Sequence, residues 1–217
     1  NSTWLIGKPL KQDLEKILKR DVLIENDANC FAISEAFDGA GSKAHTVFGV
    51  ILGTGVGAGI VIGKKIHKGK NKIAGEWGHN PLPWANEGEL PGKKCYCGRT
   101  GCLETFISGP AIEREFNNLH GKNLNMKNIV KESGAGNFKA EQTIRNFEDR
   151  LARALAHVIN ILDPDSIVLG GGLSNIDRLY SNVPKIWGEY IFSDDVSTVL
   201  SKASFGDSSG VRGAAWL

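Results

Sequence analysis

Features that mark several large classes of protein are missing from this 217-residue sequence. No apolar run approaches the roughly 20 residues that a membrane-spanning helix needs. No secretory signal peptide opens the chain, so we expect a cytoplasmic protein without a membrane partner. The formal net charge is only +2, which is too small to predict a nucleic-acid partner. What remains is a composition typical of globular domains, with 41% hydrophobic and 23% charged residues.

Cysteine is scarce, with four residues in all, yet three of them lie close together as Cys95, Cys97 and Cys102. A Cys-x-Cys pair does not bridge comfortably, and Cys30 belongs to a distant apolar segment, so the even number does not predict disulfides. Three thiolates and one imidazole suit Zn²⁺ better than any hard cation. With His79 as the fourth ligand, the set predicts a tetrahedral zinc site. Free cysteines in a turn and a surface histidine are the alternatives.

The stretch that holds these four side chains, residues 75–109, shows neither a helical nor a strand period. Its prolines and glycines predict an irregular loop, which we call the 75–109 loop. Something other than an apolar core must hold such a loop, and a metal ion would do so. Glu76 and Glu104 flank the proposed ligands, so two carboxylates and the metal share one loop.

Helical and strand periods alternate along the rest of the chain. Apolar residues three and four apart predict helices, and short β-branched runs predict strands. This alternation favours an α/β domain with a mixed sheet. We predict helices over residues 8–19, 28–37, 109–119, 138–162, 176–190 and after a turn at 206–210, strands over 22–24, 46–52, 59–62 and 166–169, and a hairpin turn at 63–64.

Asn26 and Asp27 follow a predicted strand and precede a predicted helix. Open α/β sheets gather their ligands at such carboxyl ends of strands. Asp27 could take a proton from a substrate hydroxyl as a general base, and Asn26 offers both a donor and an acceptor to a polyol. The structural alternative is that Asp27 only caps the helix that follows.

Two glycine-rich segments could let backbone N–H groups approach a phosphate. The first, Gly53-Thr54-Gly55-Val56-Gly57, is not a Walker A loop, because no Gly-Lys-Ser/Thr follows it. A tight hairpin explains it equally well. The second, Gly170-Gly171-Gly172, has a predicted strand before it and a predicted helix after it, which favours a nucleotide site.

Taken together, four motifs in order closely resemble the ROK family of bacterial sugar kinases and sugar-responsive repressors. The match covers essentially the whole chain. Within the family, residues 76–84 and 95–97 look most like bacterial fructokinases with mannose activity, and N-acetylglucosamine kinases are the nearest relatives. The motifs are Glu25-Asn26-Asp27-Ala28-Asn29, Gly53-Thr54-Gly55-Val56-Gly57, Glu76-x-Gly78-His79 and Cys95-x-Cys97-Gly98-x-x-Gly101-Cys102-x-Glu104.

The resemblance implies the actin-like, RNase H-like ATPase fold, with a sugar and ATP in a cleft between two lobes. It implies that Asp27 is the catalytic base and that ATP acts with Mg²⁺. Four protein ligands leave a zinc ion no open position, so its part would be structural. The sugar would be held by Asn26, Asp27, Glu76, His79 and Glu104, phosphate and adenosine by Gly53, Thr54, Gly55, Gly170, Gly171 and Gly172, and zinc by His79, Cys95, Cys97 and Cys102.

By the same resemblance, residues 1–217 are the carboxy-terminal part of a kinase, with a zinc loop at 75–109 and an adenosine-binding strand and helix at 166–190. The family's first phosphate loop, Asp-x-Gly-Gly-Thr, is absent from these residues, so we expect the chain alone to be a poor kinase or none. The expected reaction of the parent protein is phosphorylation of fructose to fructose 6-phosphate. The alternatives are a glucose, mannose or N-acetylglucosamine kinase, or a sugar-responsive repressor. A homodimer is expected.

Overall fold

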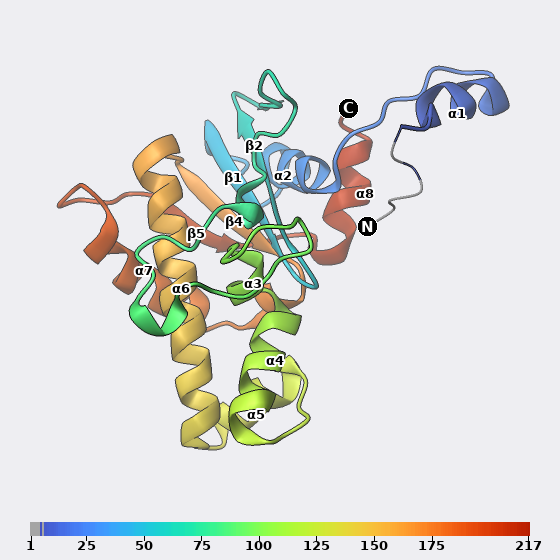
Figure 1. The fold of residues 1–217 in the computed structure, drawn as a ribbon. Coiled ribbons are helices and arrows are strands. Elements are labelled where there is room, and N and C mark those ends of the chain that lie inside the picture. Colours follow the sequence, from blue (N-terminus) through green and yellow to red (C-terminus); the bar gives the residue numbers. More distant parts are fainter. Residues whose placement is uncertain (1–4, 6) are drawn as a thin grey trace.

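The computed structural model describes residue 5 and residues 7–217, and in this part of the chain a five-stranded mixed sheet organises the fold (Figure 1). The strand order is β3-β2-β1-β4-β5. β1 pairs antiparallel with β2 and parallel with β4, so the α/β expectation with a mixed sheet is confirmed. The strands are β1 (Thr46–Leu52), β2 (Val56–Ile62), β3 (Lys65–Ile66), β4 (Ser166–Gly170) and β5 (Val199–Lys202).

Helices cover both faces of the sheet. On one face lie α2 (Asp27–Phe37) and α8 (Ser209–Ala214), and α6 (Phe138–Leu162) lies on the other with the larger apolar core. Alternate residues of β1 face opposite cores, as the pleat requires: Phe48 packs on the α6 side and Val47 on the α2 side.

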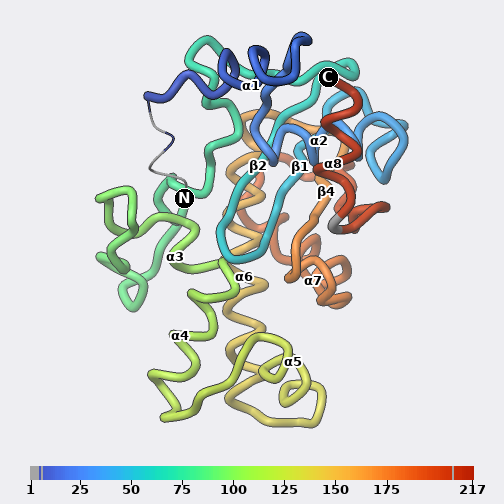
Figure 2. The backbone as a smooth tube through the Cα atoms, turned by 90° about the vertical axis from the view of Figure 1, so that its right-hand side faces the viewer, coloured from blue at the N-terminus to red at the C-terminus, as the bar shows by residue number. Residues whose placement is uncertain are grey.

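The helices α3 (Glu104–Ile107), α4 (Gly109–His120), α5 (Met126–Gly134) and α7 (Leu179–Trp187) belong to the larger core. α4, α5 and the first half of α6 project together from the sheet in both views (Figures 1 and 2). No helix of the described residues combines the length and the apolar character needed to cross a bilayer.

Two glycines bring α2 directly against the sheet. Gly49 and Gly59 are partners in the β1–β2 register. A Cβ on Gly59 would lie 2.6 Å from the carbonyl oxygen of Ala28, and one on Gly49 would lie 2.8 Å from the Cα of Ala32. Only glycine permits this approach, and it places the N-terminus of α2 beside the β1–β2 turn.

Several helices begin at side-chain caps, which is why their predicted limits agree with the structure. The side chain of Ser108 accepts the N–H of Ala111 at the start of α4, and Asn137 caps α6 in the same way. Asp163, with φ of 46°, ends α6 in the left-handed conformation. The predicted helix over 138–162 is therefore confirmed residue for residue.

Other predicted elements were wrong or incomplete. Residues 22–24 do not form a strand, because no strand of the described residues pairs with them, and Leu23 remains 66% exposed. The helix expected over 176–190 is confined to α7, between the 3-10 helices η4 (Gly172–Asn175) and η5 (Gly188–Tyr190). α5 and β5 were not predicted. The helix expected over 8–19 is present as α1 (Leu10–Leu18), and it has no buried residue.

Candidate functional site

Three separate segments meet around one cavity of about 430 Å³. They are the N-terminus of α2, the β1–β2 turn and the 75–109 loop. Every side chain predicted to hold a substrate lines this cavity: Asn26, Asp27, Glu76, His79 and Glu104, together with Gly53, Thr54 and Gly55. The sequence separates these residues by up to 78 positions, from Asn26 to Glu104, so the fold alone brings them together.

Asn26, and not Asp27, caps helix α2. The Oδ1 atom of Asn26 accepts the backbone N–H groups of Ala28 at 2.9 Å and of Asn29 at 3.2 Å. Its Nδ2 group is left to donate, so Asn26 does not offer the donor and acceptor pair that we expected. Asp27 is the first residue of the helix, and its Oδ1 atom also accepts the Ala28 N–H, at 2.9 Å.

Glu104 is fixed between the loop and the sheet. It is the first residue of α3, and its Oε2 atom accepts the N–H of Val56 at 3.0 Å. A Cβ on Gly55 would lie 2.8 Å from this oxygen, so the glycine of the turn makes room for the carboxylate. Glu76 lies on the same cavity as an exposed side chain, directly before the 3-10 helix η2 (Trp77–His79).

The four predicted metal ligands form one cluster. A ring nitrogen of His79 and the sulfurs of Cys95, Cys97 and Cys102 all lie within 4.8 Å of one another. Cys95 Sγ is 3.5 Å from His79 Nδ1, and the sulfurs of Cys97 and Cys102 are 3.6 Å apart. Zn–S bonds of about 2.3 Å in a tetrahedron place neighbouring sulfurs about 3.8 Å apart. The donor set and its spacing therefore fit a tetrahedral zinc ion.

The thiols of the cluster have contrasting environments. Burial raises the pKa of the Cys102 thiol to about 12. The backbone N–H of Arg99 lowers the pKa of the exposed Cys97 thiol. A metal ion bound by this buried thiol would displace its proton, so metal binding would depend on pH.

Tyr96, which was not predicted as a site residue, completes the surroundings of His79. Its hydroxyl lies 3.0 Å from His79 Nε2, while the Nδ1 atom of the same ring faces Cys95. Tyr96 also lines the cavity. The sequence did contain a sign of this role, because Tyr96 lies between the proposed ligands Cys95 and Cys97 and is therefore held close to the cluster.

Backbone pairing holds the two ends of the 75–109 loop together. Pro81 and Cys102 form an isolated bridge, as do Lys94 and Thr100. The N–H of Leu103 donates to the carbonyl of Asn80 at 2.8 Å. The segment that follows His79 therefore lies beside the segment that precedes Glu104.

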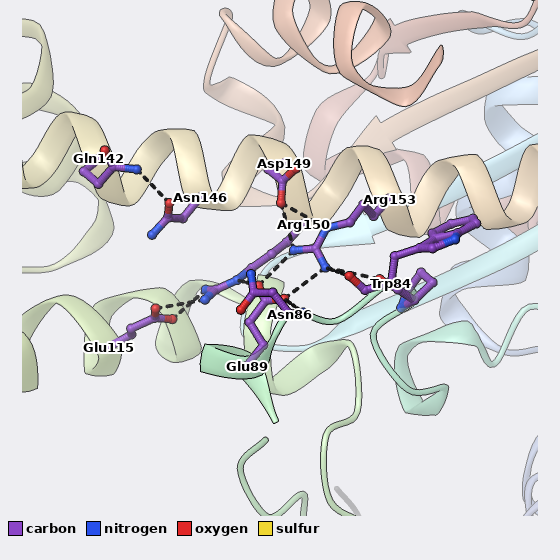
Figure 3. Close-up of polar contacts among 10 residues, drawn as sticks. Trp84, Asn86, Glu89, Glu115, Gln142, Asn146, Asp149, Arg150 and Arg153 are labelled. Atoms are coloured by element: carbon purple, nitrogen blue, oxygen red, sulfur yellow. Dashed lines mark hydrogen bonds and ion pairs between the residues drawn. The ribbon is translucent and has the colours of Figure 1, made fainter. Parts of the chain in front are cut away.

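A buried ion network joins the same loop to helix α6 (Figure 3). Glu89, in the 3-10 helix η3 (Glu87–Glu89), accepts hydrogen bonds from Arg150 and Arg153, both on α6. Arg150 also makes a two-pronged contact with Glu115 of α4, at 2.6 and 3.0 Å. Although burial raises the pKa of Glu89, hydrogen bonds from Arg153 and Arg150 lower it to about 2.

A larger cavity of about 720 Å³ adjoins the first at Gly53 and Thr54, which line both. Of the second glycine segment only Gly172 lines it. Gly170 and Gly171 have packing reasons instead. A Cβ on Gly170 would lie 2.4 Å from the Phe31 ring, and Gly171 has φ of 79° close to the Leu52 carbonyl. The cavity also includes residues of α4 and α5 that were not predicted to line a site. They are Gly109, Pro110 and Glu113 of the predicted helix α4, and Met126, Lys127 and Val130 of α5, which was not predicted.

Comparisons with known proteins agree with one another. The model of the ROK family matches residues 1–217. Over 215 residues the chain is 42% identical to an N-acetyl-D-glucosamine kinase of Vibrio vulnificus, covering 97% of this chain and 71% of that protein. The crystal structure of a ROK hexokinase from Thermus thermophilus superposes with a TM-score of 0.85 at 29% identity, covering 95% of this chain and 68% of that one.

A ROK family glucokinase from Streptomyces griseus, solved with glucose and AMPPNP, superposes with a TM-score of 0.81 at 29% identity, covering 95% of this chain and 71% of that one. The chain has the actin-like ATPase fold of these neighbours, as expected. The finer likeness to fructokinases is not supported by the relatives named above. The match over its full length shows that the chain belongs to the ROK family.

Proposed function

We propose that this chain carries the sugar site of an ATP-dependent hexose kinase, and that N-acetyl-D-glucosamine is its preferred sugar. The observation that carries the proposal is the cavity in which Asn26, Asp27, Glu76, His79 and Glu104 meet. The sequence motifs had favoured fructose, but the 42% identity to an N-acetyl-D-glucosamine kinase supports N-acetyl-D-glucosamine instead. Two expectations stay predictions: that residues 1–217 are the carboxy-terminal part of the kinase, and that the protein is a homodimer.

Asp27 is the proposed general base. The Ala28 N–H fixes one carboxylate oxygen, and Oδ2 has no hydrogen-bond partner among the described residues. Oδ2 is thus available to accept the proton of a sugar hydroxyl as its oxygen forms a bond to the γ-phosphorus and ADP leaves. Phosphoryl transfer asks a protein mainly to position the acceptor in line and to neutralise charge, so a fixed carboxylate at this place suits the reaction.

The other cavity residues would hold the sugar. Glu76 and Glu104 are carboxylates that accept hydrogen bonds from hydroxyl groups, and Asn26 Nδ2 donates one. A volume of about 430 Å³ lies in the range of small-molecule sites. His79 would serve both the sugar and the metal, with its Nε2 atom 3.0 Å from the Tyr96 hydroxyl and its Nδ1 atom facing Cys95.

The larger cavity is the proposed nucleotide site. Gly53 and Thr54 border both cavities, so their backbone and hydroxyl groups would meet the phosphates between nucleotide and sugar. Gly172 and Ile176 would face the nucleoside. The adenosine site expected over 166–190 is thus proposed for only a few residues of that range. When bound, Mg²⁺ would neutralise the phosphate charge.

Zinc is proposed as a structural ion. His79 and the three cysteines supply four ligands, which leave no open position for Lewis-acid work. Its effect would be to fix Glu76 and Glu104, which flank the cluster in sequence, against the sugar.

A sugar-responsive repressor of the same family is the second candidate function. A sensor needs neither a base nor a phosphate-binding turn, so Asp27 and the turn at 53–55 favour the kinase.

A coupled assay of the full-length protein tests the proposal. N-acetylglucosamine, fructose, mannose and glucose are compared at saturating ATP, and ADP release is followed. We expect turnover with the highest kcat/KM for N-acetylglucosamine. A higher kcat/KM for fructose would contradict the sugar assignment, and binding of a hexose without any ADP release would favour the repressor.

A further inference from the structure

We propose that Glu89 is a positioning residue for the sugar cavity, because it anchors the 75–109 loop at a second point that does not depend on the metal cluster. The inference rests on the proposed function, since it names a residue that places the sugar-binding carboxylate. Glu89 itself does not line the cavity that holds Glu104. It acts through Arg150 and Arg153.

The anchor is buried and fully satisfied. The side chains of Glu89, Arg153 and Arg150 are only 5%, 3% and 10% exposed. Each carboxylate oxygen of Glu89 accepts two N–H groups: Oε1 from Arg150 and Arg153, both at 2.8 Å, and Oε2 from Arg153 at 3.0 Å and the Asn86 backbone at 3.1 Å. Figure 3 shows both arginines extending from α6 toward Glu89. With its pKa near 2, Glu89 stays ionised at any ordinary assay pH.

The Arg153 side of the anchor holds the first half of the loop. Its Nη1 atom also donates to the backbone carbonyls of Pro83 at 3.2 Å and of Trp84 at 2.9 Å. The residues just before them, 80–82, make backbone hydrogen bonds to residues 101–103. Arg153 therefore holds residues 83–84, and through residues 80–82 it also restrains residues 101–103, which lead directly into α3.

The Arg150 side of the anchor contacts α3 itself. The guanidinium of Arg150 lies 5.4 Å from the centre of the Phe106 ring. Phe106 belongs to the four-residue helix that starts with Glu104. The same guanidinium is held by Glu115 of α4. Glu89 thus joins two arginines, which Glu115 and Asp149 also hold. These arginines contact the chain before and after the sugar-binding glutamate.

We expect this network to fix the orientation of the side chains it joins, and not to raise the free energy of unfolding. Burying two guanidinium groups and a carboxylate costs desolvation free energy that well-packed apolar side chains would avoid. A planar guanidinium with a two-pronged carboxylate contact instead fixes one mutual orientation. A binding site needs its groups held to about 0.5 Å, and a loop of short helical turns joined by irregular segments is less precise than a long helix or a strand.

The test uses the full-length, zinc-loaded enzyme with Glu89→Gln, which keeps the shape and removes the charge. Glu87→Gln is the matched control, because Glu87 lies exposed on the same 3-10 helix. For Glu89→Gln we expect the hexose KM to rise about ten- to hundredfold, as for other displaced binding groups. The KM for ATP and the zinc content should stay as in the wild type, and Glu87→Gln should match the wild type throughout.

A wild-type hexose KM in Glu89→Gln would overturn the inference. So would loss of zinc, or an equal rise in both KM values, because either result would reveal a general structural role. If Glu89→Gln does not fold, Arg153→Lys keeps the charge but loses the planar fork, and the same outcomes apply.

Hydrogen exchange separates this inference from the proposed function. In the zinc-loaded protein, Glu89→Gln should speed exchange in residues 80–84 and 103–107, whether or not any hexose is phosphorylated. Unchanged exchange there would overturn the anchor. A wild-type enzyme that phosphorylates no hexose, with faster exchange in the variant, would instead contradict the proposed function alone.

Discussion

Asn26 and Asp27 divide two tasks at the N-terminus of α2. Both lone pairs of the Asn26 carbonyl oxygen are used by the N–H groups of Ala28 and Asn29. Asp27 is consequently not needed as the cap, and it lines the cavity at a place where the Ala28 N–H holds one of its oxygens. The sequence predicted a ligand site at this pair, and the structure has a cavity there. The sequence could not assign the cap, because either side chain suits it.

Substituting Asp27 by Asn in the intact enzyme should lower kcat by about 10² to 10⁴, the usual contribution of a positioned base. The hexose should still bind, because the amide keeps the shape and the hydrogen bond from Ala28. Steady-state kinetics and calorimetry measure the two effects. Asp194→Asn, on an exposed loop, is the control. Equal kcat in Asp27→Asn and the wild type would remove Asp27 from the role of base.

At the scale of elements, local signals decided what could be predicted. α6 combines a helical apolar period with a side-chain cap at Asn137 and a left-handed end at Asp163, so its limits followed from the sequence. A strand depends on a partner that is often far away in sequence, and the pattern of 22–24 carries no information about one. The four residues of β5 are too few to show a period, and they pair with β4 through tertiary structure.

The 75–109 loop was predictable because its ligands are local. Three cysteines and a histidine within 24 residues, from His79 to Cys102, need little long-range folding to form a cluster. The Glu89 network was not predictable, because its arginines lie 61 and 64 positions away in sequence. The sequence of this loop thus indicates a candidate metal cluster, but it does not indicate the buried ion network that joins the loop to α6.

Cys97→Ser should remove one ligand of this loop, and we expect zinc content to fall from one ion per chain and hexose affinity to fall about tenfold or more. Chelation of the wild type should have the same effect. Elemental analysis and calorimetry with the hexose make the comparison, with Lys93→Ser, an exposed position of the same loop, as the control. Freshly purified wild type without zinc would refute the metal site.

For the whole molecule, the arrangement of the two cavities is the main result of the fold. The close packing of α2 on Gly49 and Gly59 brings Asp27 to the turn that separates them. The residues expected to hold the sugar come together in one cavity, and the sequence indicated them because their motifs are compact and chemically distinctive. Of the residues expected to hold phosphate and adenosine, Gly53, Thr54 and Gly172 line the larger cavity, whereas Gly170 and Gly171 serve packing.

The central claim is that the cavity lined by Asp27 and Glu104 binds a hexose. Calorimetric titration of N-acetylglucosamine into the zinc-loaded full-length protein tests this claim most directly. The account predicts one hexose bound per chain. It also predicts affinity about ten- to a hundredfold lower in Glu104→Gln, since a hydrogen bond to a charged group is lost. Affinity in Glu104→Gln equal to that of the wild type, or no binding of any hexose by the zinc-loaded wild type, would contradict it.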